Sequence, residues 1–477
     1  MDDQLKIGFS AIVRVDAPTQ LGTFAHVAAL IAEAGGRIGA VDVNRVSRKR
    51  AIRDISIDVA DEDQLNAIVS ELGKIEGVRV VNVSDRTFLA HLGGKIEVNP
   101  RMPVNNREAL SRVYTPGVAR VSLAIQADPS KAYTLTIKHN MVAVVTDGTA
   151  VLGLGDVGPF AALPVMEGKA MLFKAFANVD AFPICLDTTD VDAIIETVAR
   201  IAPAFGGINL EDISSPRCYE IEDRLIELLD IPVMHDDQHG TAIVLLAALI
   251  NALKIVRKKL SDVTIVVNGI GAAGAACAKI LISAGAKDVI GVDRAGALVS
   301  GTAYPENKMW QWIADHGNAE HRKGPLSAVI AGADVFIGVS APNVLTVDDV
   351  KKMAKDPVVF AMANPLPEIA PDLAEPYVAV IATGRSDYPN QVNNLLAFPG
   401  VFRGALDARA RRINEPMKLA AAHAIASVIR DDELSSEYII PSVFDPRVVE
   451  AVSRAVAAAA VESGVARKHE DESAPAL

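Results

Sequence analysis

The first 85 residues follow patterns typical of alternating strands and helices. Residues 6 to 15 alternate apolar and polar positions as a half-buried strand does, and residues 21 to 34 carry apolar side chains at helical spacing before Gly35-Gly36. Two strands, a helix and a last strand are predicted to follow, at residues 37–46, 51–59, 61–72 and 78–83. The predicted order βαββαβ is that of a ferredoxin-like domain.

The remaining pattern predicts a larger α/β body. Residues 89 to 106, with Gly93-Gly94, interrupt the periodicity and are predicted to form a linker. Mixed strands and helices continue to about residue 240, where GTAIVLLAALINALKIV predicts a long buried helix leading into a βαβ-type domain. Apolar faces at residues 417–429 and 447–461 predict helices that pack against the preceding domains.

Composition and charge exclude several classes of partner. The formal net charge of −12 in 477 residues argues against a nucleic acid, because phosphate backbones are bound by clustered Lys and Arg. The longest basic runs, Arg48-Lys49-Arg50 and Arg257-Lys258-Lys259, are short. No run of ~18 uncharged apolar residues predicts a membrane span, and the acidic start lacks the pattern of a signal peptide. We therefore predict a cytoplasmic protein that binds neither nucleic acid nor a membrane.

A glycine-rich turn between a Val/Ile-rich strand and a helix is the clearest binding motif. Gly269 permits a tight turn, Gly271 lets the backbone approach a pyrophosphate, and Gly274 permits close packing of the helix, whose N-terminus supplies N–H donors. A glycine turn without a ligand is the alternative, which the strand–turn–helix context makes less favoured. The predicted dinucleotide-binding residues are Gly269, Ile270, Gly271, Ala272, Ala273 and Gly274.

The end of the next predicted strand bears on the choice of dinucleotide. Asp293 stands where an acidic side chain accepts hydrogen bonds from a ribose and repels a 2′-phosphate. This favours NAD over NADP. Arg294 follows directly and could offset the repulsion, so NADP remains possible.

Two pairs of acidic residues, Glu211-Asp212 and Asp236-Asp237, each follow a short apolar run that resembles a strand. Carboxylates gathered at strand ends repel one another unless a cation is bound, and Mg²⁺ or Mn²⁺ prefers such oxygen ligands. Acidic turns exposed to water are one alternative. Zinc held by His235 and His239 is another, less favoured because Asp replaces the general-base Glu and Gly240 follows at once.

Seven segments in fixed order resemble malic enzymes, and the shorter bacterial branch most of all. The resemblance spans about residues 105 to 430 and rests on VYTPGVA, VVTDGTAVLGLGDVGP, PVMEGKAMLFK, INLEDI, HDDQHGTA, FAMANP and NNLLAFPG. It implies oxidative decarboxylation of L-malate to pyruvate and carbon dioxide, with a divalent metal and NAD or NADP.

The resemblance also implies residue roles. Tyr114 and Lys169 match the catalytic tyrosine and lysine, and Asp236 would support them. Lys169, if neutral, would take the proton of the C2 hydroxyl, and Tyr114 would protonate C3 of enolpyruvate. The metal ligands would be Glu211, Asp212 and Asp237. Ser340 and Ala341 would line the cofactor cleft, and substrate or nicotinamide would be contacted by Lys169, Asn364 and Asn394.

One departure concerns Thr149-Ala150, where many larger malic enzymes carry an arginine before the LGLGD segment. Recognition of one malate carboxylate is therefore expected to differ. Two rival functions remain open. One is another NAD(P)-dependent dehydrogenase that is regulated by the amino-terminal unit, and the other is a non-catalytic effector-sensing module.

The amino-terminal unit, with Asp16-x-Pro18-x-x-Leu21-Gly22 at its first strand-to-helix turn, resembles an ACT domain. Such domains usually bind a small effector. A role in dimerisation alone fits the same sequence equally well. We expect symmetric association of the whole chain into a dimer or a tetramer.

The complete prediction is a multidomain α/β protein. Its parts are a ferredoxin-like, ACT-type regulatory domain (1–88), a linker (89–105), an α/β catalytic and metal-binding domain (106–255), a Rossmann-type NAD(P)-binding domain (256–414), C-terminal helices packed on the body (415–462) and a disordered tail (463–477).

Overall fold

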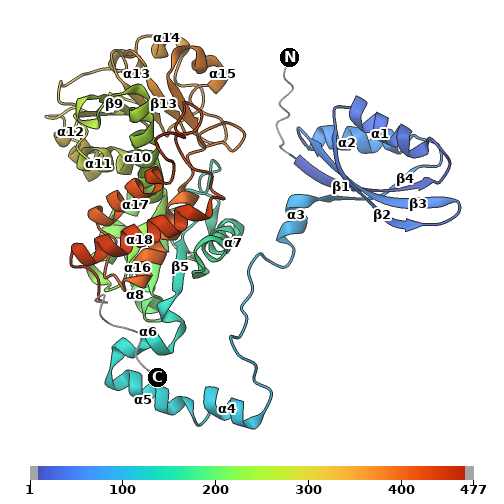
Figure 1. The fold of residues 1–477 in the computed structure, drawn as a ribbon, viewed down its shortest axis with the longest axis horizontal. Coiled ribbons are helices and arrows are strands. Elements are labelled where there is room, and N and C mark those ends of the chain that lie inside the picture. Colours follow the sequence, from blue (N-terminus) through green and yellow to red (C-terminus); the bar gives the residue numbers. More distant parts are fainter. Residues whose placement is uncertain (1–8, 468–477) are drawn as a thin grey trace. The chain divides into compact units, whose positions relative to one another are not determined.

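The computed structural model describes residues 9 to 467 and divides the chain into two compact units, Met1–Val98 and Asn99–Leu477 (Figure 1). Of the predicted tail (463–477), residues 468–477 lie outside the described residues. The last helix ends at Glu462, directly before that tail.

The first unit is a four-stranded antiparallel sheet with two helices on one face. Its elements are β1 (Phe9–Pro18), α1 (Thr23–Glu33), β2 (Arg37–Val46), β3 (Arg50–Val59), α2 (Glu62–Leu72) and β4 (Arg79–Asp85), and the strand order is β2-β3-β1-β4. Every second residue of β1, such as Val13 and Val15, is buried against Ile31 of α1 and Ile68 of α2. The predicted βαββαβ order is confirmed.

One helix extends into the predicted linker. Asp85 accepts hydrogen bonds from the backbone N–H groups of Thr87 and Phe88 and so begins α3 (Arg86–His91), which ends inside the predicted linker. After an irregular stretch, the second unit opens with α4 (Arg107–Val113), α5 (Val118–Ala127) and α6 (Ala132–Leu135).

The first sheet of the second unit is parallel, in the order β6-β5-β7-β8. Its strands are β5 (Met141–Thr146), β6 (Asp180–Cys185), β7 (Gly207–Leu210) and β8 (Val233–His235). Helices α7 (Gly158–Ala177), α8 (Val191–Ile201) and α9 (Arg217–Leu228) connect them. Because the strands are parallel, the residues that follow β5, β7 and β8 meet at one edge of the sheet.

The long helix α10 (Asp236–Val256) begins before the position predicted for it. The prediction placed its start near residue 240, but the helix starts directly after β8, and Asp236 and Asp237 occupy its first turn. Carboxylates are favoured there because they face the positive end of the helix dipole. Both acidic side chains are thereby fixed by the helix.

Among residues 9 to 467, α10 is also the one helix long and apolar enough to cross a membrane, with a mean hydropathy of 1.8. However, 67% of that apolar window is buried inside the protein. A core helix of this kind passes the same composition test, so its burial accounts for its hydropathy.

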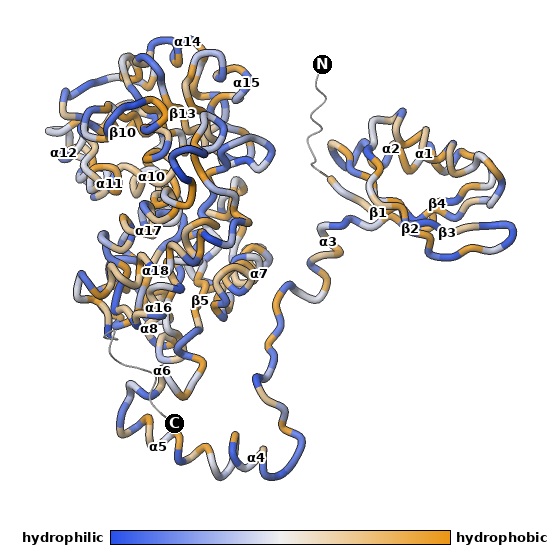
Figure 2. The backbone as a smooth tube through the Cα atoms, in the orientation of Figure 1, coloured by the Kyte–Doolittle hydropathy of each residue, from blue (hydrophilic) through white to orange (hydrophobic). Residues whose placement is uncertain are grey.

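A second, six-stranded sheet follows in the order β11-β10-β9-β12-β13-β14, parallel except for the short β11. Its strands are β9 (Thr264–Asn268), β10 (Asp288–Asp293), β11 (Gly296–Ala297), β12 (Val335–Gly338), β13 (Val358–Ala361) and β14 (Val380–Thr383). The helices are α11 (Ala272–Ser283), α12 (Lys308–His316), α13 (Leu326–Val329), α14 (Val347–Val350) and α15 (Pro371–Ala374). Figure 2 shows β13 as a hydrophobic strand. Each of its residues is buried. This is the predicted Rossmann-type half.

The C-terminal helices close the core between the two sheets. They are α16 (Phe398–Asp407), α17 (Glu415–Ser427) and α18 (Pro446–Glu462). Phe173 of α7 packs edge-on against Phe398 and Phe402 of α16, with ring centroids 4.7 and 5.4 Å away. One continuous apolar cluster therefore includes β5, α7, α10, β9 and the C-terminal helices.

Candidate active site

Three carboxylates from two distant parts of the chain converge at the edge of the first sheet. Oxygen atoms of Glu211 and Asp212, which follow β7, and of Asp237, in the first turn of α10, lie within 4.8 Å of one another. The predicted gathering of the two acidic pairs is therefore observed. The three side chains are the candidate cation ligands.

Backbone contacts hold this acidic cluster in place. The backbone N–H of Asp212 donates to Oδ2 of Asp237 at 2.8 Å, and the carbonyl of Asp212 accepts from the backbone N–H of Ala150 at 3.0 Å. Asp212 has a φ of 53°, in the left-handed region that a short Asp side chain tolerates. Asn209, which the sequence did not single out, donates to Oε2 of Glu211 at 2.8 Å.

Lys169 places a basic group among these acids. Its Nζ lies 2.6 Å from Oδ2 of Asp236 and 2.9 Å from Oε1 of Glu211, and 4.0 Å from the ring centre of Phe398. The side chain is only 8% exposed. Asn394, at the start of the 3₁₀ helix η6 (Asn394–Leu396), donates to the same Asp236 oxygen at 2.6 Å.

Burial sets the charge of the cluster. Burial, followed by repulsion from Asp237 and Glu211, raises the pKa of Asp212 to about 9. Burial also dominates at Glu211, whose pKa rises to about 7, and at Asp236 and Asp237, whose pKa values rise to about 6; in all three the charge of Lys169 opposes it. Protons therefore compete with a cation for these oxygens near neutral pH.

The neighbouring charges, and not burial, decide the pKa of Lys169. Burial alone would lower its pKa, but the charges of Asp236 and Glu211 outweigh burial and raise the pKa above its ordinary value. Its amine is therefore charged in this arrangement, whereas the sequence argument required a neutral amine for proton abstraction.

The donor set fits a hard divalent cation. Oδ2 of Asp212 is buried and has no hydrogen-bond partner among the described residues, although a buried carboxylate oxygen is costly to leave unsatisfied. The converging atoms are all carboxylate oxygens, the ligands that Mg²⁺ and Mn²⁺ prefer.

Hydrogen bonds from the HDDQH segment converge on Glu222. Nε2 of His239 donates to Glu222 of α9 at 3.0 Å, and Glu222 also accepts from the backbone N–H of His235 at 2.8 Å and from Gln238 at 3.1 Å. Burial would raise the pKa of Glu222, but His239 and other cationic neighbours lower it to about 2. Nε2 of His235 lies 3.7 Å from Oδ2 of Asp237, but neither histidine joins the three carboxylates whose oxygens lie within 4.8 Å of one another, so the zinc alternative gains no support.

The glycine turn has the geometry of a pyrophosphate-binding loop. Gly269 has a φ of 96°, and Gly274 lies so close to it that an added Cβ would be 1.9 Å from the Gly269 carbonyl oxygen. Around Gly271 an added Cβ would meet nothing within 4 Å, so the backbone is open to a ligand there. Ala272 and Ala273 form the first turn of α11 and Ile270 is buried. The turn therefore fits a dinucleotide.

A cavity of about 700 Å³ adjoins the turn. It is lined by Ser215, Pro216, Ile270, Gly271, Asp293, Arg294, Ala303, Tyr304, Pro305, Glu306, Asn307 and Trp310. Asp293 ends β10 as predicted, and Trp310 donates from its indole N–H to the Ile270 carbonyl at 2.6 Å. The aromatic residues of this wall, Tyr304 and Trp310, were missed because the sequence from β11 into α12 carries no recognisable motif.

Two further predicted residues lie at the ends of strands of the second sheet. Ser340 follows β12 and accepts a hydrogen bond at Oγ from Asn268 at 2.8 Å, and Ala341 is exposed beside it. Asn364 follows β13 and precedes a cis proline; an added Cβ at Gly153 would lie 3.1 Å from its carbonyl oxygen. The Asn364 loop thus approaches the LGLGD loop of the first sheet.

Tyr114 is the predicted residue that the structure does not bring to the cluster. Its side chain is 67% exposed at the end of α4, and no described hydrogen bond joins it to Lys169 or to the carboxylates.

The position without the expected arginine has an arginine nearby. Arg217 of α9 donates to Oγ1 of Thr149 at 2.9 Å and to Oδ2 of the buried Asp147 at 2.9 Å. These bonds tie the loop after β5 to the loop after β7. Arg217 was not predicted, because no local pattern marks it.

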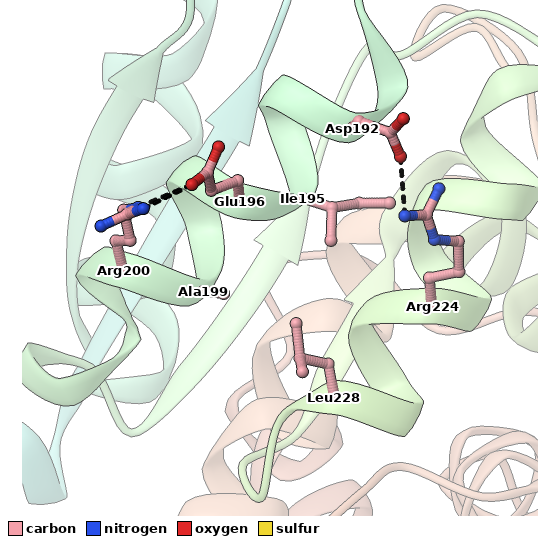
Figure 3. A pocket seen from close by; sticks show the side chains of 7 residues that line it. All are labelled: Asp192, Ile195, Glu196, Ala199, Arg200, Arg224 and Leu228. Carbon is pink, nitrogen blue, oxygen red and sulfur yellow. Dashed lines mark hydrogen bonds and ion pairs between the residues drawn. The ribbon is translucent and has the colours of Figure 1, made fainter.

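A separate hollow of about 530 Å³ lies between α8 and α9 (Figure 3). Ile195 and Leu228 line it, and an ion pair of 2.7 Å joins Asp192 to Arg224 at its rim. None of the predicted site residues lines this hollow, so it is not part of the candidate site.

Comparisons with protein families agree with this geometry. Residues 93–226 match the malic enzyme N-terminal domain, residues 238–465 the malic enzyme NAD binding domain, and residues 7–82 the ACT domain. The chain is 65% identical to the NAD-dependent malic enzyme of Geobacillus stearothermophilus, over 96% of this chain and 95% of that protein. It is 56% identical to the bifunctional malic/malolactic enzyme of Bacillus subtilis, over 78% and 92%.

Solved structures give the same result. A malic enzyme from Pyrococcus horikoshii aligns with a TM-score of 0.77 at 49% identity, covering 79% of this chain and 89% of that one. The NAD-dependent malic enzyme of Thermotoga maritima aligns with a TM-score of 0.75 at 50% identity, covering 78% and 99%.

A Rossmann-type half joined to an α/β half that presents buried carboxylates and a buried lysine defines a dinucleotide-dependent oxidoreductase. The chain belongs to the malic enzyme family and carries an ACT domain at its amino-terminal end. The predicted fold class and family are thereby confirmed.

The raised pKa values predict a pH-dependent cation affinity. A cation must displace the protons that Asp212 and Glu211 retain, so its binding strengthens as pH rises through their pKa values of about 9 and about 7. We expect the dissociation constant for Mn²⁺, measured calorimetrically without other ligands, to fall at least about tenfold from about pH 6 to about pH 8.

Asp237→Asn should weaken Mn²⁺ binding by at least about tenfold, because one charged ligand is lost. Asp192→Asn, which alters an exposed carboxylate of α8, is the matched control and should bind as the unaltered protein does. For the pH prediction above, a Mn²⁺ affinity that does not change with pH would contradict the assignment of these carboxylates as cation ligands.

Proposed function

We propose that this protein oxidatively decarboxylates L-malate to pyruvate and carbon dioxide, with reduction of NAD and with Mg²⁺ or Mn²⁺ as the metal. The observation that supports this most is the joint position of Glu211, Asp212 and Asp237 beside the buried amine of Lys169. Membership of the malic enzyme family agrees with it.

Glu211, Asp212 and Asp237 would hold the metal. When bound, the metal supplies a Lewis acid that polarises the C2 oxygen and offsets the negative charge formed as carbon dioxide departs. The protein contributes position: two ligands come from the loop after β7 and the third from the first turn of α10, so both elements fix the site.

Lys169 takes the proton of the C2 hydroxyl as hydride leaves C2. Its amine is charged in the described arrangement, so it must first lose a proton. Asp236, whose Oδ2 lies 2.6 Å from that amine, is the group placed to hold that proton. Asn394 donates to the same Asp236 oxygen and fixes its orientation.

The glycine turn would hold the pyrophosphate of the dinucleotide and Asp293 its ribose, while Ser340, Ala341 and Asn364 would line the cleft for the nicotinamide. Asp293 lines the cavity beside the turn, which supports NAD as the preferred cofactor. Asn364 and Asn394 contact the substrate from the side of the second sheet.

Reduction of NAD by malate tests the function directly. The full chain should raise the near-ultraviolet absorbance of NADH only when malate, Mn²⁺ and NAD are all present, and EDTA should abolish the signal. An amino acid supporting NAD reduction without a metal would instead favour a different dehydrogenase. NADH binding without any turnover would favour the effector-sensing alternative.

Lys169→Ala should reduce kcat for malate oxidation at least about a thousandfold, because the acceptor of the hydroxyl proton is lost. The dissociation constant for NADH, measured by fluorescence, should change little. Lys174→Ala is the matched control on the same helix, since Lys174 is exposed and pairs with Asp180. Normal turnover by Lys169→Ala would remove the lysine from the mechanism.

Asp293→Ala should reduce the preference for NAD. Loss of the carboxylate removes its bond to the ribose and its repulsion of a 2′-phosphate. We expect the ratio of kcat/KM for NAD to that for NADP to fall about tenfold. If this ratio stays constant, another residue sets the specificity.

We further propose that the protein is a homo-oligomer in which a second copy completes the site with Tyr114, which protonates C3 of enolpyruvate. The exposed apolar side chains near Tyr114, namely Leu110, Val113 and Leu123, support a covering partner.

The ACT domain is proposed as the site of a small effector. We also propose that the domains have the boundaries that were predicted from the sequence.

Mixing two inactive variants tests this arrangement. If Tyr114 and Lys169 of one site come from two chains, reassociated Tyr114→Phe and Lys169→Ala dimers should regain about a quarter of the full activity, because half of them are mixed and each mixed dimer has one intact site. Each variant alone is the control. A mixture no more active than the separate variants would place both residues in one chain.

A further inference from the structure

Glu368 is a buried acid outside the cluster described above. It lies on the loop that follows β13 and Asn364, and its side chain is completely buried. No ion pair joins it to a basic group anywhere in residues 9 to 467. A carboxyl group so placed must be satisfied by hydrogen-bond donors alone.

Those donors come from two loops of the dinucleotide half. Oε1 accepts from the backbone N–H of Ser340 at 2.8 Å and lies 3.2 Å from the Ser340 hydroxyl, while Oε2 accepts from the backbone N–H of Ala363 at 3.0 Å. Ser340 follows β12 and Ala363 follows β13. One carboxylate therefore joins the carboxyl ends of two neighbouring strands.

The bond to Ser340 continues to the glycine turn. Asn268, the last residue of β9, donates to the Ser340 hydroxyl at 2.8 Å, so that hydroxyl is placed to donate to Glu368. An added Cβ at Gly269 would lie 2.7 Å from the Ser340 Cβ. The turn thus packs directly on the residue that Glu368 holds.

Gly338 makes room for the carboxyl group. An added Cβ at Gly338, the last residue of β12, would lie 2.3 Å from Cδ of Glu368 and 2.6 Å from its Oε1. Gly338 has an ordinary strand conformation, so space and not backbone freedom calls for glycine at this position. The strand end and the acid are fitted to one another.

We propose that Glu368 is a positioning residue for the dinucleotide, fixing the glycine turn, the Ser340 loop and the Asn364 loop relative to one another. It acts through Ser340 and Ala363 and does not itself touch the cofactor. Because both its oxygens accept from backbone N–H groups, only an acceptor at each end of the side chain can fill the role. This inference rests on the proposed use of NAD.

Glu368→Gln tests the inference with almost no change of shape. The glutamine amide can accept one backbone N–H, but its NH₂ group must then face the other, so one buried donor is unpaired. We expect the dissociation constant of the full chain for NADH, without malate, to rise about tenfold, equivalent to about 1.4 kcal/mol. Mn²⁺ binding should stay within about twofold, because the acidic cluster is not contacted.

Glu375→Gln is the matched control. It makes the same chemical change at an exposed position in the short helix that follows α15, and it should leave the NADH constant unchanged. Hydrogen exchange gives a second readout: the amides of Ser340 and Ala363 should exchange faster in Glu368→Gln, while those of α10 should not.

Two results would overturn the inference: an NADH constant equal to that of the unaltered protein, or parallel losses of NADH binding, Mn²⁺ binding and thermal stability, which would indicate a general structural role. Should Glu368→Gln fail to fold, Asn268→Ala removes the donor to the Ser340 hydroxyl, and so the link between the glycine turn and Glu368, without altering Ser340, which is itself proposed to line the cofactor cleft. It should weaken NADH binding about threefold, and no effect would count against the proposal. Unaltered protein that binds NADH without oxidising malate would refute the proposed function and leave this inference standing.

Discussion

The arrangement of the candidate active site depends on one constraint: mutually repelling carboxylates are buried around a single amine. Glu211, Asp212, Asp236 and Asp237 lie within a few residues of two strand ends, and Lys169 is the cation that they share. Unpaired charges in a protein interior are costly, so this arrangement persists only because helix α10, the loop after β7 and Asn209 hold it. A divalent cation would relieve the remaining repulsion, and the proposed chemistry uses that same need for positive charge.

Two other buried acids show how the rest of the site is supported. Glu222 accepts hydrogen bonds from the start of α10, which carries Asp236 and Asp237. Glu368 accepts them from the strand ends beside the glycine turn. In each half of the candidate site, a carboxylate outside the proposed metal and cofactor contacts fixes the backbone that carries the proposed binding residues.

Much of this could be predicted from the sequence, where the information is local. The glycine spacing of residues 269–274 and the acidic pairs after short apolar runs indicated both binding sites, and the alternation in residues 9–85 indicated the ferredoxin-like order. Glu222 and Glu368 could not be found, because whether an acid is buried depends on packing between distant segments. Tyr114 shows the limit of motif matching, since a motif gives a residue type and not the place to which one folded chain brings it.

The apolar cluster that includes β5, α10 and β9 has a mechanical consequence. The halves of this enzyme share one close-packed interior, so neither can rotate far without opening voids in it. Helix α10 begins among the carboxylates and packs along α11, which begins at the glycine turn. A small shift of α10 would alter both the spacing of the clustered carboxylates and the position of the glycine turn. Binding of a cation at the first site would therefore change the affinity of the second site for a dinucleotide, and the reverse.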